Sequence, residues 1–251
     1  MNEWLFYGLL IPTGFAVGAI NTIAGGGSSI LYPLLIFMGF SPHQAVGTSR
    51  LAFLTQGISG ILGFRSKGFY LFPLNLYSGL IAASGAFIGA GIGLAIDGTI
   101  YKKIIALIIA LTTVAGFWHA GGNKIEKKSN ADSKNRRTLT YILFFFLGIY
   151  SGFIQTGLGF LILTVLHSVE KMNLNQANSI KAMVIFLSGI PSLLMFSSFG
   201  QVRWSEAVLL AAGTATGSWL TSRWSVKIKE NKLKRIIALL VLLLAIKLWL
   251  Y

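Results

Sequence analysis

The chain has 251 residues, of which 54% are hydrophobic and only 11% are charged, and it contains 29 glycines and no cysteine. Soluble domains carry about 25% charged residues, so this composition excludes an ordinary soluble globule. The lack of cysteine also excludes disulfides and thiolate metal sites. The formal net charge of +14 does not predict a nucleic-acid partner, because the basic residues lie in short segments between apolar runs. The composition instead predicts a polytopic membrane protein whose partner is the lipid bilayer.

Apolar segments recur along the chain and predict an all-α membrane fold. They lie at about 4–22, 28–40, 44–64, 72–96, 103–118, 139–155, 158–169, 177–199, 204–222 and 233–251. A helix needs about 20 residues to cross the hydrocarbon core, so segments 28–40 and 158–169 are too short to cross alone. We expect these two to be half-helices, re-entrant pieces or parts of broken spans, which gives about 8–10 membrane segments. The first segment follows no basic region, so we expect a retained span and not a cleaved signal peptide.

Two basic segments, 119–138 and 223–235, set the expected orientation. The positive-inside rule places short basic loops in the cytoplasm. Both segments can lie there only if each half of the chain crosses the membrane an odd number of times. We therefore expect a multi-pass protein with both of these loops in the cytoplasm.

The two halves of the chain resemble each other. A shift that places residues 102–107 over residues 234–239 also keeps several glycines in register. We expect a first membrane repeat at 1–118, a basic cytoplasmic linker at 119–138 and a second membrane repeat at 139–251. An odd number of side changes in each repeat would invert one repeat relative to the other, as is common in secondary transporters.

Glycine-rich breaks precede the two short segments, near Gly25–Gly27 and Gly157–Gly159. Glycine lets the chain turn sharply, and the helix N-terminus that follows favours an anion. In inverted-repeat transporters such breaks lie near the midplane and form the substrate site. The alternative is close helix packing through small residues. The candidate substrate-binding residues at the breaks are Asn21, Thr22, Gly25, Gly26, Gly27, Ser28, Gln155, Thr156, Gly157 and Gly159.

Two basic residues, Arg50 and Lys181, lie inside apolar segments, whereas the seven acidic residues lie in loops or at segment ends. Both cations follow a Gln-Ala pair and occupy nearly equivalent positions in the repeats. A charge within a membrane span is costly and usually functional, although a long side chain can also extend its charge to the interface. Together with the breaks, the two cations predict a shared site for a small anion. The further hydrogen-bonding candidates there are Thr48, Ser49, Gln56, Asn178 and Ser179.

Other chemistry finds no support in the sequence. His43, His119 and His167 have neither the spacing nor the carboxylate partners of a metal site. No protease, phosphate-loop or zinc signature is present. We therefore expect no metal, no cofactor and no enzymatic activity.

Several short motifs, taken in order, resemble the TauE/SafE family of sulfite exporters. They are the run 14–18, then Gly25-Gly26-Gly27-Ser28, Pro33, Gly39, Pro42, Ala45 and Gly47-Thr48-Ser49, with second-half counterparts from Gly148 through Gly159 to Gln176-Ala177-Asn178. The resemblance covers nearly the whole chain. In the second copy, Leu158 stands opposite Gly26, and Phe160-Leu161 stands opposite Ser28-Ser29.

The resemblance implies a permease of the prokaryotic inner membrane that moves sulfur-containing anions such as sulfite, sulfoacetate or thiosulfate. Its direction, export, is implied by the family alone. Alternating access between the repeats would carry the anion across. An anion channel and a non-transporting membrane scaffold or assembly protein remain the alternatives, and the oligomeric state is open.

Overall fold

The computed structural model describes residues 3–24, 26–69, 71–119, 133–224 and 243–250, and these are almost entirely helical. The labelled helices are α1 (Glu3–Ala24), α2 (Ser28–Phe37), α3 (Pro42–Arg65), α4 (Leu74–Ala95), α5 (Gly98–His119), α6 (Ser133–Phe153), α7 (Leu158–Ser168), α8 (Leu174–Ser198) and α9 (Trp204–Trp224). Residues 243–250 are also helical. The predicted all-α fold is confirmed. Gly25 and most of the two basic segments, at 120–132 and 225–235, lie outside the described residues.

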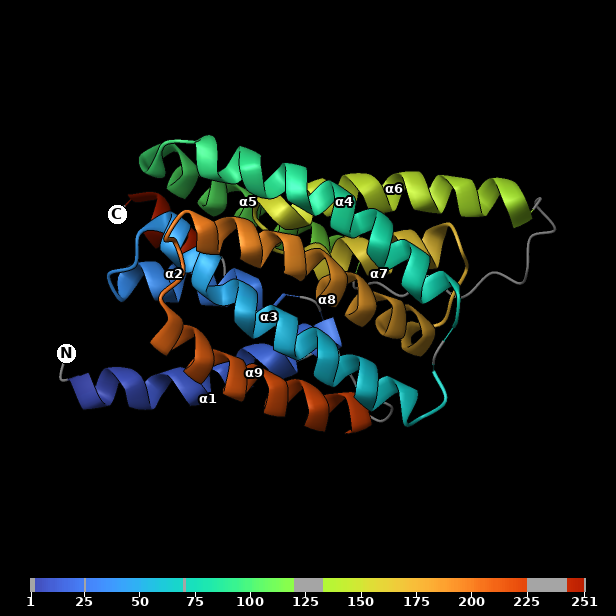
Figure 1. Cartoon of the computed structure of the whole chain (residues 1–251), viewed down its shortest axis with the longest axis horizontal. Helices are drawn as coiled ribbons and strands as arrows, with labels where there is room; N and C mark the ends of the chain where they lie inside the picture. Colours follow the sequence, from blue (N-terminus) through green and yellow to red (C-terminus); the bar gives the residue numbers. More distant parts are fainter. Residues whose placement is uncertain (1–2, 25, 70, 120–132, 225–242, 251) are drawn as a thin grey trace.

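The helices of the two halves follow the same order of lengths. In each half a long helix (α1 or α6) precedes a short one (α2 or α7), and two long helices follow. Helices α3 and α8 even begin alike, because the Ser41 and Asn173 side chains each accept a hydrogen bond from the backbone N–H three residues later. Figure 1 shows that α1, α3 and α9 run in one direction along the long axis, whereas α6, α8 and α4 run in the other. Corresponding helices of the two halves are therefore inverted.

The two short helices form hairpins with the helices before them. In Figure 1, α1 enters from the end that holds the N-terminus, and α2 returns towards that end. Helices α6 and α7 form the same hairpin from the opposite end. The short helices begin at Ser28 and Leu158, after Gly27 and Gly157. They are re-entrant pieces, one of the forms that their lengths predict.

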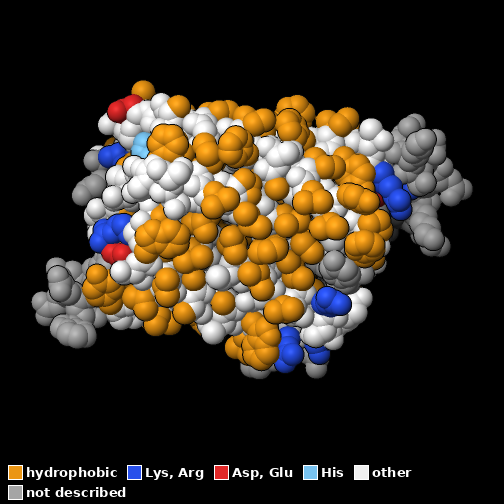
Figure 2. All heavy atoms as spheres, in the orientation of Figure 1, with side chains coloured by type: hydrophobic (Ala, Val, Ile, Leu, Met, Phe, Trp, Pro, Cys, Tyr) orange, Lys and Arg blue, Asp and Glu red, His pale blue; other side chains and the backbone are white. Residues whose placement is uncertain are grey.

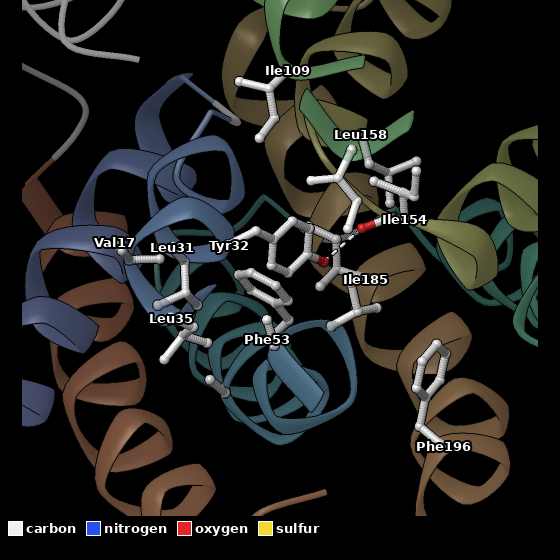
Figure 3. Packing of buried hydrophobic residues seen from close by; sticks show 14 of the residues in the cluster. Val17, Leu31, Tyr32, Leu35, Phe53, Ile109, Ile154, Leu158, Ile185 and Phe196 are labelled. Atoms are coloured by element: carbon white, nitrogen blue, oxygen red, sulfur yellow. Dashed lines mark hydrogen bonds between the residues drawn. The ribbon is translucent and has the colours of Figure 1, made fainter. Parts of the chain in front are cut away.

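The two halves are interleaved. The main helix–helix contacts pair α4 with α6, α1 with α9, α3 with α9, α4 with α8, and α3 with α8. Each of these pairs joins one half to the other. Glycines bring the backbones together: a Cβ atom on Gly89 of α4 would clash with the Ile149 carbonyl of α6, and one on Gly18 of α1 would clash with Thr214 of α9. The buried core, part of which is drawn in Figure 3, is therefore shared by both halves.

The outer surface fits a lipid environment. Among the described residues, helices α4 and α8 and residues 98–115 of α5 are long and apolar enough to cross a membrane. Large apolar side chains such as Phe87, Leu111, Phe146 and Leu194 are exposed. Figure 2 shows hydrophobic side chains across the middle of one face, with Lys and Arg towards the two ends. The chain is a polytopic membrane protein.

Candidate functional site

Lys181 lies within α8 and is only 2% exposed. Its ammonium group donates hydrogen bonds to the backbone carbonyls of Asn21 at 3.1 Å and Thr22 at 2.9 Å. Both carbonyls belong to the last turn of α1, just before the first break. A helix C-terminus carries about half a negative charge, so the lysine lies where a cation is most favourable.

Arg50 has the equivalent position on α3 and is fully buried. Its Nη1 donates to the Ser151 carbonyl and to the side-chain oxygen of Gln155, both at 2.6 Å, and its Nη2 donates to the Gly152 carbonyl at 2.6 Å. These acceptors lie at the end of α6 and in the second break. The guanidinium also lies 5.3 Å from the centre of the Phe196 ring, and its Nε is buried without a hydrogen-bond partner among the described residues.

The two cations are therefore related by the repeat. A cation on α3 of the first half holds the end of α6 in the second half, and a cation on α8 of the second half holds the end of α1 in the first. The residues that precede the short helices, Gly27 and Gly157, stand 130 positions apart. The shift that places residues 102–107 over residues 234–239 instead pairs Gly27 with Gly159, which lies inside the first turn of α7.

Side chains also hold the other carbonyls of the second break. The Tyr101 hydroxyl donates to the Phe153 carbonyl, and the Tyr32 hydroxyl donates to the Ile154 carbonyl. The Ser28 hydroxyl donates to the Gln155 carbonyl, and the Tyr150 hydroxyl donates to the Thr156 carbonyl. Figure 3 shows the Tyr32 hydroxyl directed at the Ile154 carbonyl, at 2.5 Å. The Ser151 and Gly152 carbonyls accept hydrogen bonds from Arg50. Six consecutive carbonyls, from Ser151 to Thr156, therefore accept side-chain hydrogen bonds. The Ser28 bond, at 3.4 Å, links the two breaks directly.

A small pocket lies beside Lys181. Its lining residues are Thr22, Gln56, Gly57, Gly60, Phe64, Asn178, Lys181, Ala182, Ile185 and Ser218. Asn21 adjoins it, because its side-chain amide donates to the Gln56 oxygen at 3.0 Å. The Asn178 side chain is 2% exposed, and its oxygen has no hydrogen-bond partner among the described residues. The structure thus brings five predicted residues together around one pocket.

The remaining predicted residues lie elsewhere. Arg50, Gln155, Thr156 and Gly157 gather at the second break, and Ser28 reaches that break from α2. Three more form local or helix-to-helix bonds: Thr48 accepts from the Arg203 N–H, Ser49 donates to the Val46 carbonyl, and Ser179 accepts from Asn75. The carbonyls of Gly26 and Gly27 accept from the first N–H groups of α2, and Gly25 lies outside the described residues.

Sequence reasoning missed two kinds of residue. Ser218 of α9 lines the pocket, where its hydroxyl bonds Thr22 and the Gln56 carbonyl. Tyr32 and Tyr101 support the second break, although a tyrosine in an apolar run suggests only core packing or an interface. The available signal was chemical, since a buried tyrosine hydroxyl needs a partner and a helix break has carbonyls to offer.

The described acidic residues lie away from this pocket, at helix ends. Asp97 precedes α5, Glu206 in the first turn of α9 pairs with Arg203, and Glu170 accepts a bond from Thr140 at 2.6 Å. Among the described residues no group of three or more His, Asp or Glu side chains is placed to hold a metal ion. The pocket therefore combines a buried cation with neutral hydrogen-bonding groups.

Inverted, interleaved halves with broken helices and an internal pocket are typical of secondary transporters. The family model for the sulfite exporter TauE/SafE matches residues 10–248, and the chain belongs to this family. It is a membrane transporter and not an enzyme.

Named relatives agree with this class. The chain is 28% identical over 224 residues to a "probable membrane transporter protein" of Haemophilus influenzae, which covers 86% of this chain and 83% of the relative. It is 26% identical over 243 residues to "probable membrane transporter protein ORF9" of a Sinorhizobium species, which covers 95% of this chain and 90% of the relative. No solved structure matches the chain.

Proposed function

We propose that the protein exports a small sulfur-containing anion, such as sulfite, sulfoacetate or another organosulfonate, by alternating access. The anion binds in the pocket beside Lys181, which Thr22, Gln56 and Asn178 also line and which Asn21 adjoins. The single observation that carries the proposal is this buried lysine in a pocket whose described lining contains no carboxylate.

Electrostatics favours an anion there. Burying an ammonium group costs several kcal/mol unless opposite charge compensates it. The carbonyls at the end of α1 supply about half a negative charge. A monoanion at about 4 Å would add about 4 kcal/mol of attraction at an effective dielectric constant of about 20. The pocket is therefore suited to one small negative charge and unsuited to a cation.

The basic helix ends favour one orientation of the chain in a prokaryotic inner membrane. Helices α3 and α9 end with Arg65 and Arg223 at the end of the molecule where α6 begins near Arg136 and Arg137. The positive-inside rule places this end in the cytoplasm. Independently of this orientation, a negative-inside potential drives a monoanion outward with about 2.3 kcal/mol per 100 mV, without a coupling ion.

Counterflow in proteoliposomes tests the proposal. Radiolabelled sulfite is the probe, and sulfoacetate, thiosulfate, sulfate and chloride are unlabelled competitors. We expect saturable counterflow that only some competitors suppress. Lys181→Gln should reduce the apparent affinity at least about tenfold, which corresponds to about 1.4 kcal/mol. The matched control, Lys67→Gln, removes an exposed loop cation and should leave counterflow unchanged.

Each opposing result has a clear meaning. Unitary currents in a planar bilayer would show that the protein is an anion channel and not a carrier. Folded, monodisperse protein that neither transports nor is stabilised by any of these anions would favour a scaffold. Unchanged counterflow in Lys181→Gln would move the substrate site away from this pocket.

A further inference from the structure

We propose that the pocket beside Lys181 admits a compact anion of the size of sulfite and discriminates against anions that carry an organic group. Gly60 of α3, Ala182 of α8 and Ser218 of α9 set this size limit, because the three helices meet at these residues on the wall of the pocket. This inference rests on the proposed anion site and selects among its candidate substrates.

Glycines recur at every third position of α3 beside the pocket, at Gly57, Gly60 and Gly63. A Cβ atom on Gly57 would lie 2.9 Å from the backbone nitrogen of Phe186 in α8, and one on Gly63 would lie 2.7 Å from the Ser222 Cβ in α9. Both distances are shorter than real Cβ contacts, so these two glycines are needed for the packing of α3 against α8 and α9. Close contacts on both sides of Gly60 therefore fix the separation of the three helices in this conformation.

Gly60 lies between these contacts and lines the pocket. A Cβ atom there would lie 3.1 Å from the Ala182 Cβ and 3.6 Å from the Ser218 Oγ, and both of these residues also line the pocket. Ser218 is held in place, because its hydroxyl donates to the Gln56 carbonyl at 3.1 Å and accepts from the Thr22 hydroxyl at 3.0 Å. This part of the wall has room for the smallest side chains only, so one methyl group more or less changes the width of the pocket.

A buried polar atom independently indicates a compact, protonated ligand. The Asn178 side chain lines the same pocket and is 2% exposed, and its oxygen accepts no hydrogen bond from the described residues. A buried acceptor without a donor is destabilising. Hydrogen sulfite combines the single negative charge that suits Lys181 with an O–H group that can donate to Asn178. A sulfonate of the same charge carries an organic group and lacks that proton, and a site with a buried polar group rejects an analogue that leaves it unpaired.

Competition against counterflow of radiolabelled sulfite tests the size limit. The assay is run at mildly acidic pH, where sulfite is mainly the singly charged hydrogen sulfite. The competitors are methanesulfonate and ethanesulfonate, which are also monoanions and add one and two carbon atoms to the charged sulfur group. We expect wild-type protein to bind sulfite at least about tenfold more tightly than methanesulfonate, because one carbon group in a closed pocket costs about tenfold or more. Ethanesulfonate should compete more weakly still.

Variants of the wall should change this preference in opposite directions. Ala182→Gly removes a methyl group and should remove most of the preference for sulfite over methanesulfonate, whereas Gly60→Ala adds one and should increase the preference. The double variant transfers the methyl group across the 3.1 Å contact and should restore the wild-type preference. Gly91→Ala, on a face of α4 where a Cβ atom would meet only Met195, is the matched control and should leave the preference unchanged. Ala182→Gly adds no atoms, so it tests the wall even if Gly60→Ala does not fold.

Thermal stabilisation by sulfite separates failure of this inference from failure of the proposed function. If sulfite stabilises the protein and is transported, but both sulfonates compete as well as unlabelled sulfite does, the size limit is refuted while the anion site stands. Folded Ala182→Gly protein with the wild-type preference would also refute the size limit. If sulfite neither stabilises the wild-type protein nor is transported, the sulfite site itself is refuted, and the size limit with it.

Discussion

Arg50 donates a hydrogen bond from Nη1 to the side-chain oxygen of Gln155 at 2.6 Å. Gln155 has a left-handed backbone, with φ at 66°, which residues other than glycine rarely adopt. The backbone of Gln155 is also bonded, since its N–H donates to the Tyr150 carbonyl and its own carbonyl accepts from Ser28. A buried cation on α3 thus stabilises an unfavourable turn at the end of α6.

Substitution of Gln155 separates the hydrogen bond from the backbone strain. Gln155→Ala removes the bond to a charged donor, worth about 1.5–3 kcal/mol, and keeps the strained φ. Gln155→Gly also removes the bond but relieves about 1–2 kcal/mol of left-handed strain. We expect both variants to unfold at a lower temperature than wild type in detergent, with the alanine variant the less stable. Equal melting temperatures for the two variants would mean that the backbone at this position carries no strain.

Much of the fold could be predicted because it depends on local rules. The short apolar runs near Gly27 and Gly157 set the lengths of α2 and α7, and the opposed directions of corresponding helices are consistent with an odd number of membrane crossings in each half. The interleaving of the halves could not be predicted. Which helix a glycine of α4 or α1 approaches depends on contacts between residues far apart in the chain, and one sequence does not contain that information.

The candidate site was predicted in part. Arg50 and Lys181 are the buried cations of the midregion, as their positions in apolar segments indicated. Their hydrogen-bond partners include helix C-terminal carbonyls, whereas the glycine-rich breaks predicted a site at the helix N-termini that follow the glycines. Glycines mark a break, but a break has two helix ends, and only the three-dimensional register decides which of them faces a cation. A direct contact of Arg50 with substrate stays a prediction.

Close packing between α4 and α6 predicts a sharp difference between two glycines of one helix. A Cβ atom on Gly89 would clash with the Ile149 carbonyl, whereas one on Gly91 would meet only the flexible end of Met195 at 3.8 Å. Gly89→Ala should therefore destabilise the protein by about 1–3 kcal/mol through overpacking. Gly91→Ala should be neutral or stabilise it by up to about 1 kcal/mol, because alanine favours the helix. Thermal unfolding of both variants in one detergent makes the comparison, and equal losses would contradict the described packing.

The start of α5 predicts a pH dependence. Hydrogen bonds from the backbone N–H groups of Thr99 and Ile100 lower the pKa of Asp97 below its ordinary value. Since the folded-state pKa is depressed, the carboxylate contributes stability at neutral pH and loses it as the pH falls below about 4. Asp97→Ala should lower the melting temperature at pH 7, and the difference from wild type should shrink at about pH 3. A difference that is the same at both pH values would exclude an ionised cap.

The inverted architecture predicts which loops face each side of the membrane. Lys67 follows α3 and Lys171 precedes α8 at one end of the molecule, whereas Thr99 begins α5 and Ser198 ends α8 at the other. All four positions are exposed, and the natural chain has no cysteine, so each can carry a single one. An impermeant maleimide should label Thr99→Cys and Ser198→Cys in intact cells, and should label Lys67→Cys and Lys171→Cys only after permeabilisation.

This labelling pattern tests inversion and orientation separately. Because Lys67 and Thr99 report on the first half and Lys171 and Ser198 on the second, each half is measured on both sides. The opposite pattern at all four positions would keep the inverted repeat but reverse its orientation, which would contradict the positive-inside rule for this chain. Labelling of Lys67→Cys together with Ser198→Cys would contradict the inverted arrangement itself, since those positions lie at opposite ends of the molecule.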